Sequence, residues 1–150
     1  MKKIFLFLIL ILFVNQCGYK KVYSSKNLNF SIKNIKKENN TINNELSSAL
    51  LGLLSKRTSD NAFDLEIQTI RSTEIKSKDS KGDPSVYVLK LKTRVIVKNM
   101  ANEKYTNVFF EEMNYNNNDD KFELSQYKKE IEKILIKETV KKIINYLANL

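Results

Sequence analysis

The residue of this chain best placed for chemistry is its only cysteine, Cys17. It follows a basic start and an unbroken apolar run from Ile4 to Val14. This run has the layout of a secretory signal, and it is shorter than the roughly 20 apolar residues that a membrane-spanning helix needs. A lone cysteine in an exported chain has no internal disulfide partner. We therefore expect residues 1–16 to be a lipoprotein signal peptide and residues 17–27 to be a lipidated cysteine with its tether.

Lipidation would place a diacylglycerol on the Cys17 thiol, and two or more acyl chains, palmitate among them, would hold the protein on a membrane. The alternative is an unmodified cysteine at the end of an uncleaved signal. Gln16 departs from the small residue that usually precedes the lipidated cysteine, so the efficiency of cleavage stays open. Gly18 is not the aspartate that retains lipoproteins in the inner membrane. We therefore expect delivery to the outer membrane, with the domain on the periplasmic side or in a barrel lumen.

Three basic residues, Lys90, Lys92 and Arg94, occupy alternate positions of a strand-like run. Alternate strand residues share one face and lie about 7 Å apart, so the three form a basic ladder. Such a ladder can contact anionic sugar-phosphate through charge-assisted hydrogen bonds. The ordinary alternative is cross-strand pairing. A hairpin centred near Ser80 would put Glu66 opposite Arg94 in an ion pair that contributes roughly 0.2–1 kcal/mol.

Composition offers little for catalysis. The chain has no histidine, which excludes Ser–His and Cys–His nucleophiles and histidine-based zinc. Glu111 and Glu112 are neighbours in a strand-like run, so they point to opposite faces, and Asp119-Asp120 resembles a helix start. We expect no catalytic residues, no metal site and no enzyme activity. Without the two lysines of residues 1–16, the chain keeps 24 basic against 17 acidic residues, a net charge of +7. This excess is either solvated surface or a site for acidic lipid.

The elements that position these residues follow from hydrophobic periodicity. Alternation predicts four strands and a 3.6-residue period predicts two helices. The expected order is a strand at 28–32 reaching toward 35, a helix at 42–57, strands at 63–75, 86–98 and 105–115, and a helix at 121–150. This β-α-β-β-β-α order predicts an α+β fold, a two-layer sandwich in which two helices cover one face of a four-stranded sheet. The other face would be open to water or a partner.

The last helix carries two apolar stripes that lie on nearly opposite sides. One contains Leu124, Tyr127, Ile131, Ile134 and Leu135; the other contains Ile136, Val140, Ile143, Ile144, Leu147 and Leu150. A straight helix cannot bury both stripes on one sheet. Either the helix bends near Ile136, or one half packs on something outside the domain and leaves residues such as Ile131 with Ile134, or Ile143 with Leu147, exposed in the isolated chain.

Two short motifs and this layout resemble the LptE family of lipopolysaccharide-assembly lipoproteins. The opening Cys17-Gly18-Tyr19-Lys20-Lys21-Val22-Tyr23 is similar to the family's Cys-Gly-aromatic-x-Pro-Leu-Tyr, with Lys21 and Val22 in place of proline and leucine. Tyr115-Asn116, before the last helix, is similar to the Tyr-Asn that often ends the family's last strand. The resemblance covers nearly the whole chain after the signal, so residues 28–150 are expected to form an LptE-like domain.

The resemblance implies a function without bond chemistry or cofactor. LptE proteins plug an LptD-type outer-membrane β-barrel, assist its assembly and bind lipopolysaccharide through basic residues. Lys81 and Lys128 lie near the family's basic binding positions and join Lys90, Lys92 and Arg94 as candidates. The expected partners are the barrel, lipopolysaccharide and, through the lipid, a membrane, but no nucleic acid. The alternative is a stand-alone basic periplasmic lipoprotein that binds phospholipid or peptidoglycan.

Overall fold

A computed structural model describes residues 28–54, 59 and 61–150. The predicted signal peptide, the predicted lipid anchor Cys17 and the tether lie outside the described residues. The elements are β1 (Ser31–Lys37), α2 (Thr41–Leu54), β2 (Ala62–Lys78), β3 (Pro84–Lys98), β4 (Lys104–Asn116) and α3 (Lys121–Leu147). The predicted order β-α-β-β-β-α is confirmed. The first and second strands extend further than expected and the last helix ends three residues earlier, whereas the predicted end of the first helix, at residue 57, lies outside the described residues.

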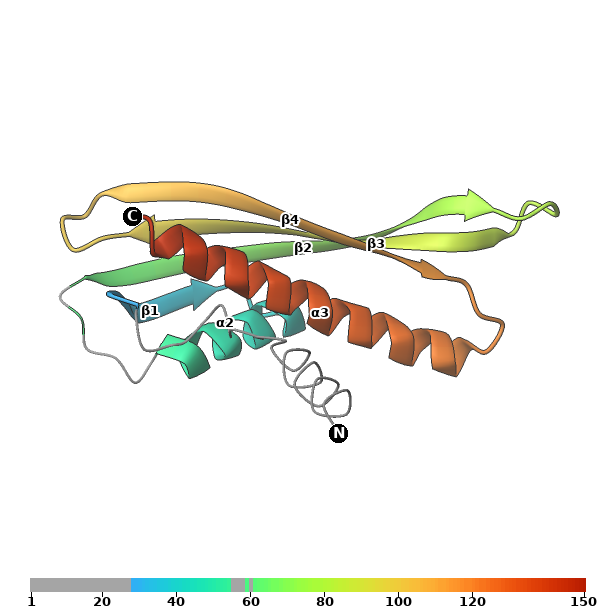
Figure 1. The fold of residues 1–150 in the computed structure, drawn as a ribbon, viewed down its shortest axis with the longest axis horizontal. Helices are drawn as coiled ribbons and strands as arrows, with labels where there is room; N and C mark the ends of the chain where they lie inside the picture. The colour runs from blue at the N-terminus through green and yellow to red at the C-terminus, as the bar shows by residue number, and fades with distance from the viewer. Residues whose placement is uncertain (1–27, 55–58, 60) are drawn as a thin grey trace, which may run out of the picture.

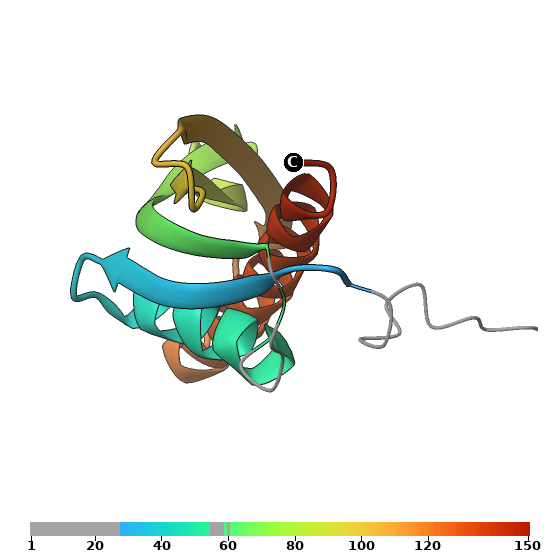
Figure 2. The ribbon, with the colours of Figure 1, turned by 90° about the vertical axis from the view of Figure 1, so that its left-hand side faces the viewer.

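The four strands form one mixed sheet in the order β1-β2-β3-β4. β1 pairs in parallel with the beginning of β2, because α2 carries the chain back across the sheet between them. β2, β3 and β4 follow as an antiparallel meander of long strands. Both helices lie on the same side of this sheet, and end-on the sheet is strongly twisted around them (Figures 1 and 2). The α+β two-layer fold is therefore confirmed.

Strand alternation decides which residues enter the core. From Leu89 to Val97 the odd-numbered residues of β3 point toward the helices and are buried, while Lys92 and Arg94 between them are exposed. The buried side chains of both layers form one cluster that includes Leu46 and Leu50 of α2 with Ile131 and Ile143 of α3. Burial of this apolar face is the main term that holds the helices on the sheet, at about 25 cal/mol per Å² of apolar area removed from water.

Each helix begins at a side chain that caps its free backbone amides. The Asn40 side-chain oxygen accepts a 2.8 Å hydrogen bond from the Asn43 N–H at the start of α2. The Asp120 carboxylate accepts the N–H groups of Phe122 and Glu123 at the start of α3, which confirms the predicted cap. Such caps satisfy amides that have no partner within the helix.

Most residues of the two stripes of α3 are buried inside the domain, although Tyr127, Ile134 and Leu150 stay about half exposed. α3 is one continuous helix that crosses the sheet diagonally and contacts α2 as well as β3 and β4 (Figure 1). Because it has neighbours on two sides, Ile131, Ile143 and Leu147 are all nearly inaccessible to solvent. Of the four residues that an absent outside partner would leave exposed to solvent, Ile134 alone is about half exposed. Neither α2 nor α3 combines the length and the apolar character that crossing a membrane requires.

The register of the β2–β3 hairpin differs from the prediction. Arg94 pairs with Gln68, and Glu66 lies opposite Ile96 and contacts Lys36 instead, at 3.7 Å. The expected ion pair between Arg94 and Glu66 is therefore wrong. The reason is the β2–β3 turn, whose centre lies one residue later in the chain than the predicted centre at Ser80. One oxygen of the Asp79 side chain accepts the backbone N–H groups of Lys81 and Asp83, and Gly82 adopts a φ of +91° that favours glycine.

The second half of β2 projects beyond the covered part of the sheet. β1 pairs only with residues as far as Ile67, and every residue from 70 to 78 is exposed. The β2–β3 turn lies at the far end of this projecting hairpin, away from both helices (Figure 1). The hairpin thus places Lys81 at one extremity of the domain.

Candidate functional site

The predicted basic ladder lies on the sheet face that the helices leave uncovered, which we call the open face. Lys90, Lys92 and Arg94 share this face of β3, each flanked by one residue of β2 and one of β4. Because the three strands are in continuous register, each lysine or arginine is the centre of a short row across the sheet. The three rows differ in chemistry.

The Lys90 row is acidic. Ser72 of β2 and Glu112 of β4 lie opposite Lys90, and the Lys90 ammonium lies 2.5 Å from a carboxylate oxygen of Glu74, two residues further along β2. The hydrogen bond with Glu74, followed by the electrostatic attraction of both carboxylates, raises the pKa of Lys90 above its ordinary value. Its positive charge is therefore already matched within the sheet.

The Lys92 row is apolar at both ends. Ile70 lies opposite Lys92 on β2 and Phe110 lies opposite it on β4, and their side chains are 61% and 63% exposed. The Lys92 ammonium sits 5.4 Å from the centre of the Phe110 ring, a cation–π contact. This row puts two large apolar side chains in water at the middle of the open face.

The Arg94 row is neutral apart from Arg94 itself. Its neighbours in register are Gln68 on β2 and Val108 on β4. Within the part of the chain that the structure describes, Arg94 forms no ion pair. A guanidinium in this setting presents its planar donors to an incoming phosphate or carboxylate.

The other two predicted basic residues lie elsewhere. Lys81 is exposed in the β2–β3 turn, and about 20 Å of strand, six residues at roughly 3.4 Å each, separates Pro84 from Lys90. Lys128 is on α3, on the opposite side of the sheet from the ladder. It borders a polar hollow beside Arg71, whose guanidinium lies 2.6 Å from the Glu132 carboxylate. The structure therefore unites three of the five candidates and leaves Lys81 and Lys128 in separate places.

The exposure of Ile70 and Phe110 on the open face was not predicted from the sequence, although the alternation of residues along the strands indicates it. Ile70 is an even-numbered residue, whereas the buried Phe63, Leu65 and Ile67 of the same strand are odd-numbered. Ile70 therefore points to the other face of the sheet. A large apolar residue on the polar side of a strand marks a contact surface or a local cover, and alternation alone identifies it.

The rival catalytic pair is separated as its strand position requires. Glu111 faces the helices, where its carboxylate lies 2.5 Å from the Lys142 ammonium of α3, and Glu112 lies on the open face. The two carboxylates cannot act on one substrate atom. The described ranges contain no group of three His, Cys, Asp or Glu side chains arranged to hold a metal ion.

Several solved structures share this fold at low sequence identity. Rare lipoprotein B from Shewanella oneidensis matches with a TM-score of 0.57 and 13% identity, over 78% of this chain and 95% of that chain. A minor lipoprotein from Acinetobacter baumannii matches with a TM-score of 0.62 and 11% identity, over 81% and 92%. Lipoprotein B from Nitrosomonas europaea matches with a TM-score of 0.59 and 16% identity, over 78% and 81%. No protein-family model and no curated protein sequence matches this chain.

These matches show what the fold is. The α+β architecture of residues 28–150 is that of bacterial lipoprotein structures, and the resemblance to the LptE family is confirmed at the level of the fold. At identities of 11–16% the likeness carries no residue roles. The roles of individual side chains must come from the geometry of this chain.

Proposed function

We propose that this chain is an outer-membrane lipoprotein that plugs or escorts an LptD-type β-barrel and assists the assembly of lipopolysaccharide. The lipoprotein-like fold supports this proposal, as does the single cysteine three residues after an apolar signal-like run. The observation that carries it is the open face, where Ile70 of β2 and Phe110 of β4 are exposed on either side of Lys92. Exposed apolar residues that polar residues surround mark a contact surface for another protein.

The layout of the open face fits that of a protein interface. Ile70 and Phe110 form an apolar centre with Lys92 between them, and the charged and polar rows of Lys90 and Arg94 flank it. Interfaces concentrate their binding energy in such a centre and surround it with polar groups. An aromatic ring and an aliphatic side chain that are both more than half exposed lose little by being covered and gain from leaving water.

Lipopolysaccharide binding would depend on Lys92 and Arg94, the two ladder residues that form no ion pair with a carboxylate among the described residues. Phosphates bind arginine and lysine through charge-assisted hydrogen bonds, and arginine can do so with two parallel bonds. We expect Arg94 to contribute most, Lys92 next, and Lys90 least, because Glu74 already neutralises it. Lys81 and Lys128 would be secondary contacts, since each lies away from the ladder.

A pull-down of the tagged full chain from its own outer membranes in mild detergent tests the barrel partner. The wild type should recover a large β-barrel in stoichiometric amount. Phe110→Glu should abolish recovery, because it places a charge at the apolar centre. Phe122→Glu is the matched control, since Phe122 is also aromatic and 71% exposed but lies at the start of α3. Equal recovery with Phe110→Glu and wild type would contradict the proposed surface.

The same experiment separates the alternative function. If no barrel is recovered while mass spectrometry finds lipid on Cys17, the chain is a free-standing envelope lipoprotein that binds phospholipid or peptidoglycan. Lipopolysaccharide binding by Arg94→Gln compared with Lys90→Gln then tests the ladder. We expect about a tenfold loss with Arg94→Gln, as for one charge-assisted contact, and a smaller loss with Lys90→Gln. A larger loss of lipopolysaccharide binding with Lys90→Gln than with Arg94→Gln would contradict the proposed ranking of these two residues.

A further inference from the structure

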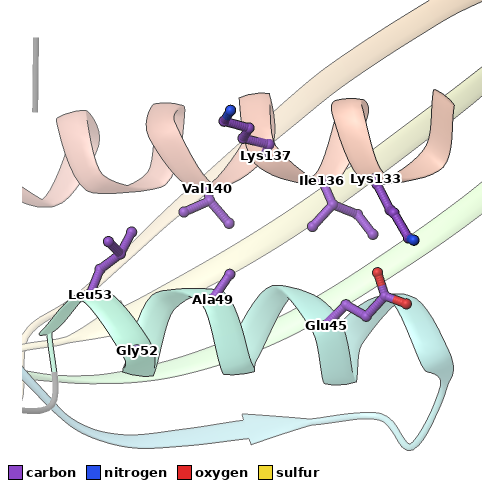
Figure 3. A pocket seen from close by; sticks show the side chains of 8 residues that line it. All are labelled: Glu45, Ala49, Gly52, Leu53, Lys133, Ile136, Lys137 and Val140. Carbon is purple, nitrogen blue, oxygen red and sulfur yellow. The ribbon is translucent and has the colours of Figure 1, made fainter. Parts of the chain in front are cut away.

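A groove separates α2 from α3 on the side of the domain away from the open face. It has a volume of about 480 Å³ and is lined on α2 by Glu45, Ala49, Gly52 and Leu53 and on α3 by Lys133, Ile136, Lys137 and Val140. The side chains of Ala49, Leu53, Ile136 and Val140 project into the space between the helices, whereas Lys137 points away from it (Figure 3). The walls of the groove are therefore almost entirely apolar.

Small residues keep this groove open. A side chain added at Gly52 would meet no atom within 4 Å of its Cβ, so the helices do not close over this position. Leu53 at the same end is about half exposed, an unusual setting for a leucine in a helix that packs on a core. From Glu45 to Leu53 the groove is about 12 Å long, eight residues at 1.5 Å rise. Its volume and its apolar walls suit one acyl chain.

One end of the apolar groove carries two charged side chains of opposite sign. Glu45 and Lys133 flank this end, where the carboxylate and ammonium point toward each other across the gap (Figure 3). The same two residues also line an adjoining hollow of about 420 Å³, together with Arg71, Lys128, Lys129 and Glu132. The apolar groove and the polar hollow therefore border each other at Glu45 and Lys133.

The charges of the hollow favour an anion. Glu132 is paired with Arg71 at 2.6 Å, so these two charges cancel. Lys128, Lys129 and Lys133 then remain against the single carboxylate of Glu45. A negative headgroup in the hollow would lie among these three ammonium groups while its chain occupied the apolar groove, as charge complementarity requires.

We propose that the α2–α3 groove binds the acyl chain of a single-chain anionic phospholipid, with its phosphate in the Lys128–Lys129–Lys133 hollow. Other occupants fit the charges less well. Residues 18–27 of this chain carry three lysines and no acidic residue, and a second copy in a symmetric contact would set lysine against lysine. The proposal does not depend on a barrel partner, so either can fail without the other.

The test is photo-labelling of the full chain in phosphatidylcholine vesicles with lysophosphatidylglycerol that carries a diazirine in its acyl chain. Mass spectrometry should locate the adducts on residues 45–53 and 133–140. Gly52→Leu should reduce the labelling about tenfold, because the new side chain takes the place of about two methylene groups that the acyl chain would otherwise bury. Ala49→Leu is a second filling variant, and an unchanged melting temperature shows that the fold is intact.

Two matched controls sharpen this result. Ser48→Leu adds the same side chain to an exposed position of α2 that does not line the groove, and it should label like the wild type. Lys133→Glu should weaken labelling by the anionic probe but not by zwitterionic lysophosphatidylcholine, whereas Lys137→Glu should change neither. Adducts confined to other segments, or full labelling of Gly52→Leu, would overturn the proposal. Labelling of the wild type that ignores headgroup charge would overturn it as well.

Discussion

The two faces of β3 show how one strand serves two surfaces. On the covered face, Leu89, Leu91, Val95 and Val97 are at most 1% exposed. On the open face, Lys90 and Lys92 alternate with them and remain in contact with water. The covered face holds α2 and α3 in place, and the open face keeps Ile70 and Phe110 of the neighbouring strands exposed. The same backbone therefore carries stability on one side and a contact surface on the other.

The comparison shows that apolar residues of one chain have different roles according to what covers them. Ile67 and Ile70 are three residues apart in β2, yet the first is 1% and the second 61% exposed. This difference in exposure arises because the odd-numbered residues of β2 face the helices and the even-numbered ones face the open side. An apolar residue on the open face does not hold the domain together and is free to bind a partner.

The largest expected contrast is in stability. Leu91→Ala should lower the free energy of unfolding by about 2–5 kcal/mol, since it removes buried methyl groups and leaves a cavity. Ile70→Ala in the adjacent strand should change it by no more than about 0.5 kcal/mol. Urea denaturation of both variants measures the difference. A loss for Ile70→Ala as large as that for Leu91→Ala would show that the open face is covered in the free protein.

A smaller contrast is expected between ion pairs on the two faces. The Glu111–Lys142 pair lies on the covered side, where the Glu111 side chain is 13% exposed, and its coupling energy should be about 1.5 kcal/mol. The Lys90–Glu74 pair on the open face is more exposed at its carboxylate, 55%, and should couple more weakly because water and salt screen it. Double-mutant cycles at low and high salt compare the two. Equal coupling and equal salt dependence would contradict the difference between the faces.

The smallest effect is the pH dependence of the β3–β4 turn at the edge of the sheet. Hydrogen bonds from Asn99, and then from Tyr105, hold the pKa of Glu103 below its ordinary value of 4.5. Since the folded pKa is the lower one, this contribution is fully present above about pH 4.5 and is lost as the pH falls through the folded pKa. An NMR titration should give a midpoint below 4.5 for Glu103, and Asn99→Ala should move it upward. A midpoint at 4.5 in the wild type would contradict this.

Sequence patterns predicted most of the fold for identifiable reasons. The alternation of β3, the stripe Ile42–Leu46–Leu50 of α2 and the cap at Asp120 are local signals, and each forms the element it predicts. The candidate site was predicted in part. Lys90, Lys92 and Arg94 do share a face because the strand period is two. Their individual partners were not predictable, since a turn centred one residue later moved Glu66 away from Arg94.

The sequence by itself determined the elements, their order, and which residues of each strand point to the same side, because these follow from backbone periodicity. It also placed the single cysteine three residues after the apolar N-terminal run. Only the tertiary structure decided which side of the sheet the helices cover, and hence that Ile70 and Phe110 stay exposed. It also joined Gly52 of α2 and Val140 of α3 in one groove. Contacts between segments far apart in the chain depend on packing, which no local pattern encodes.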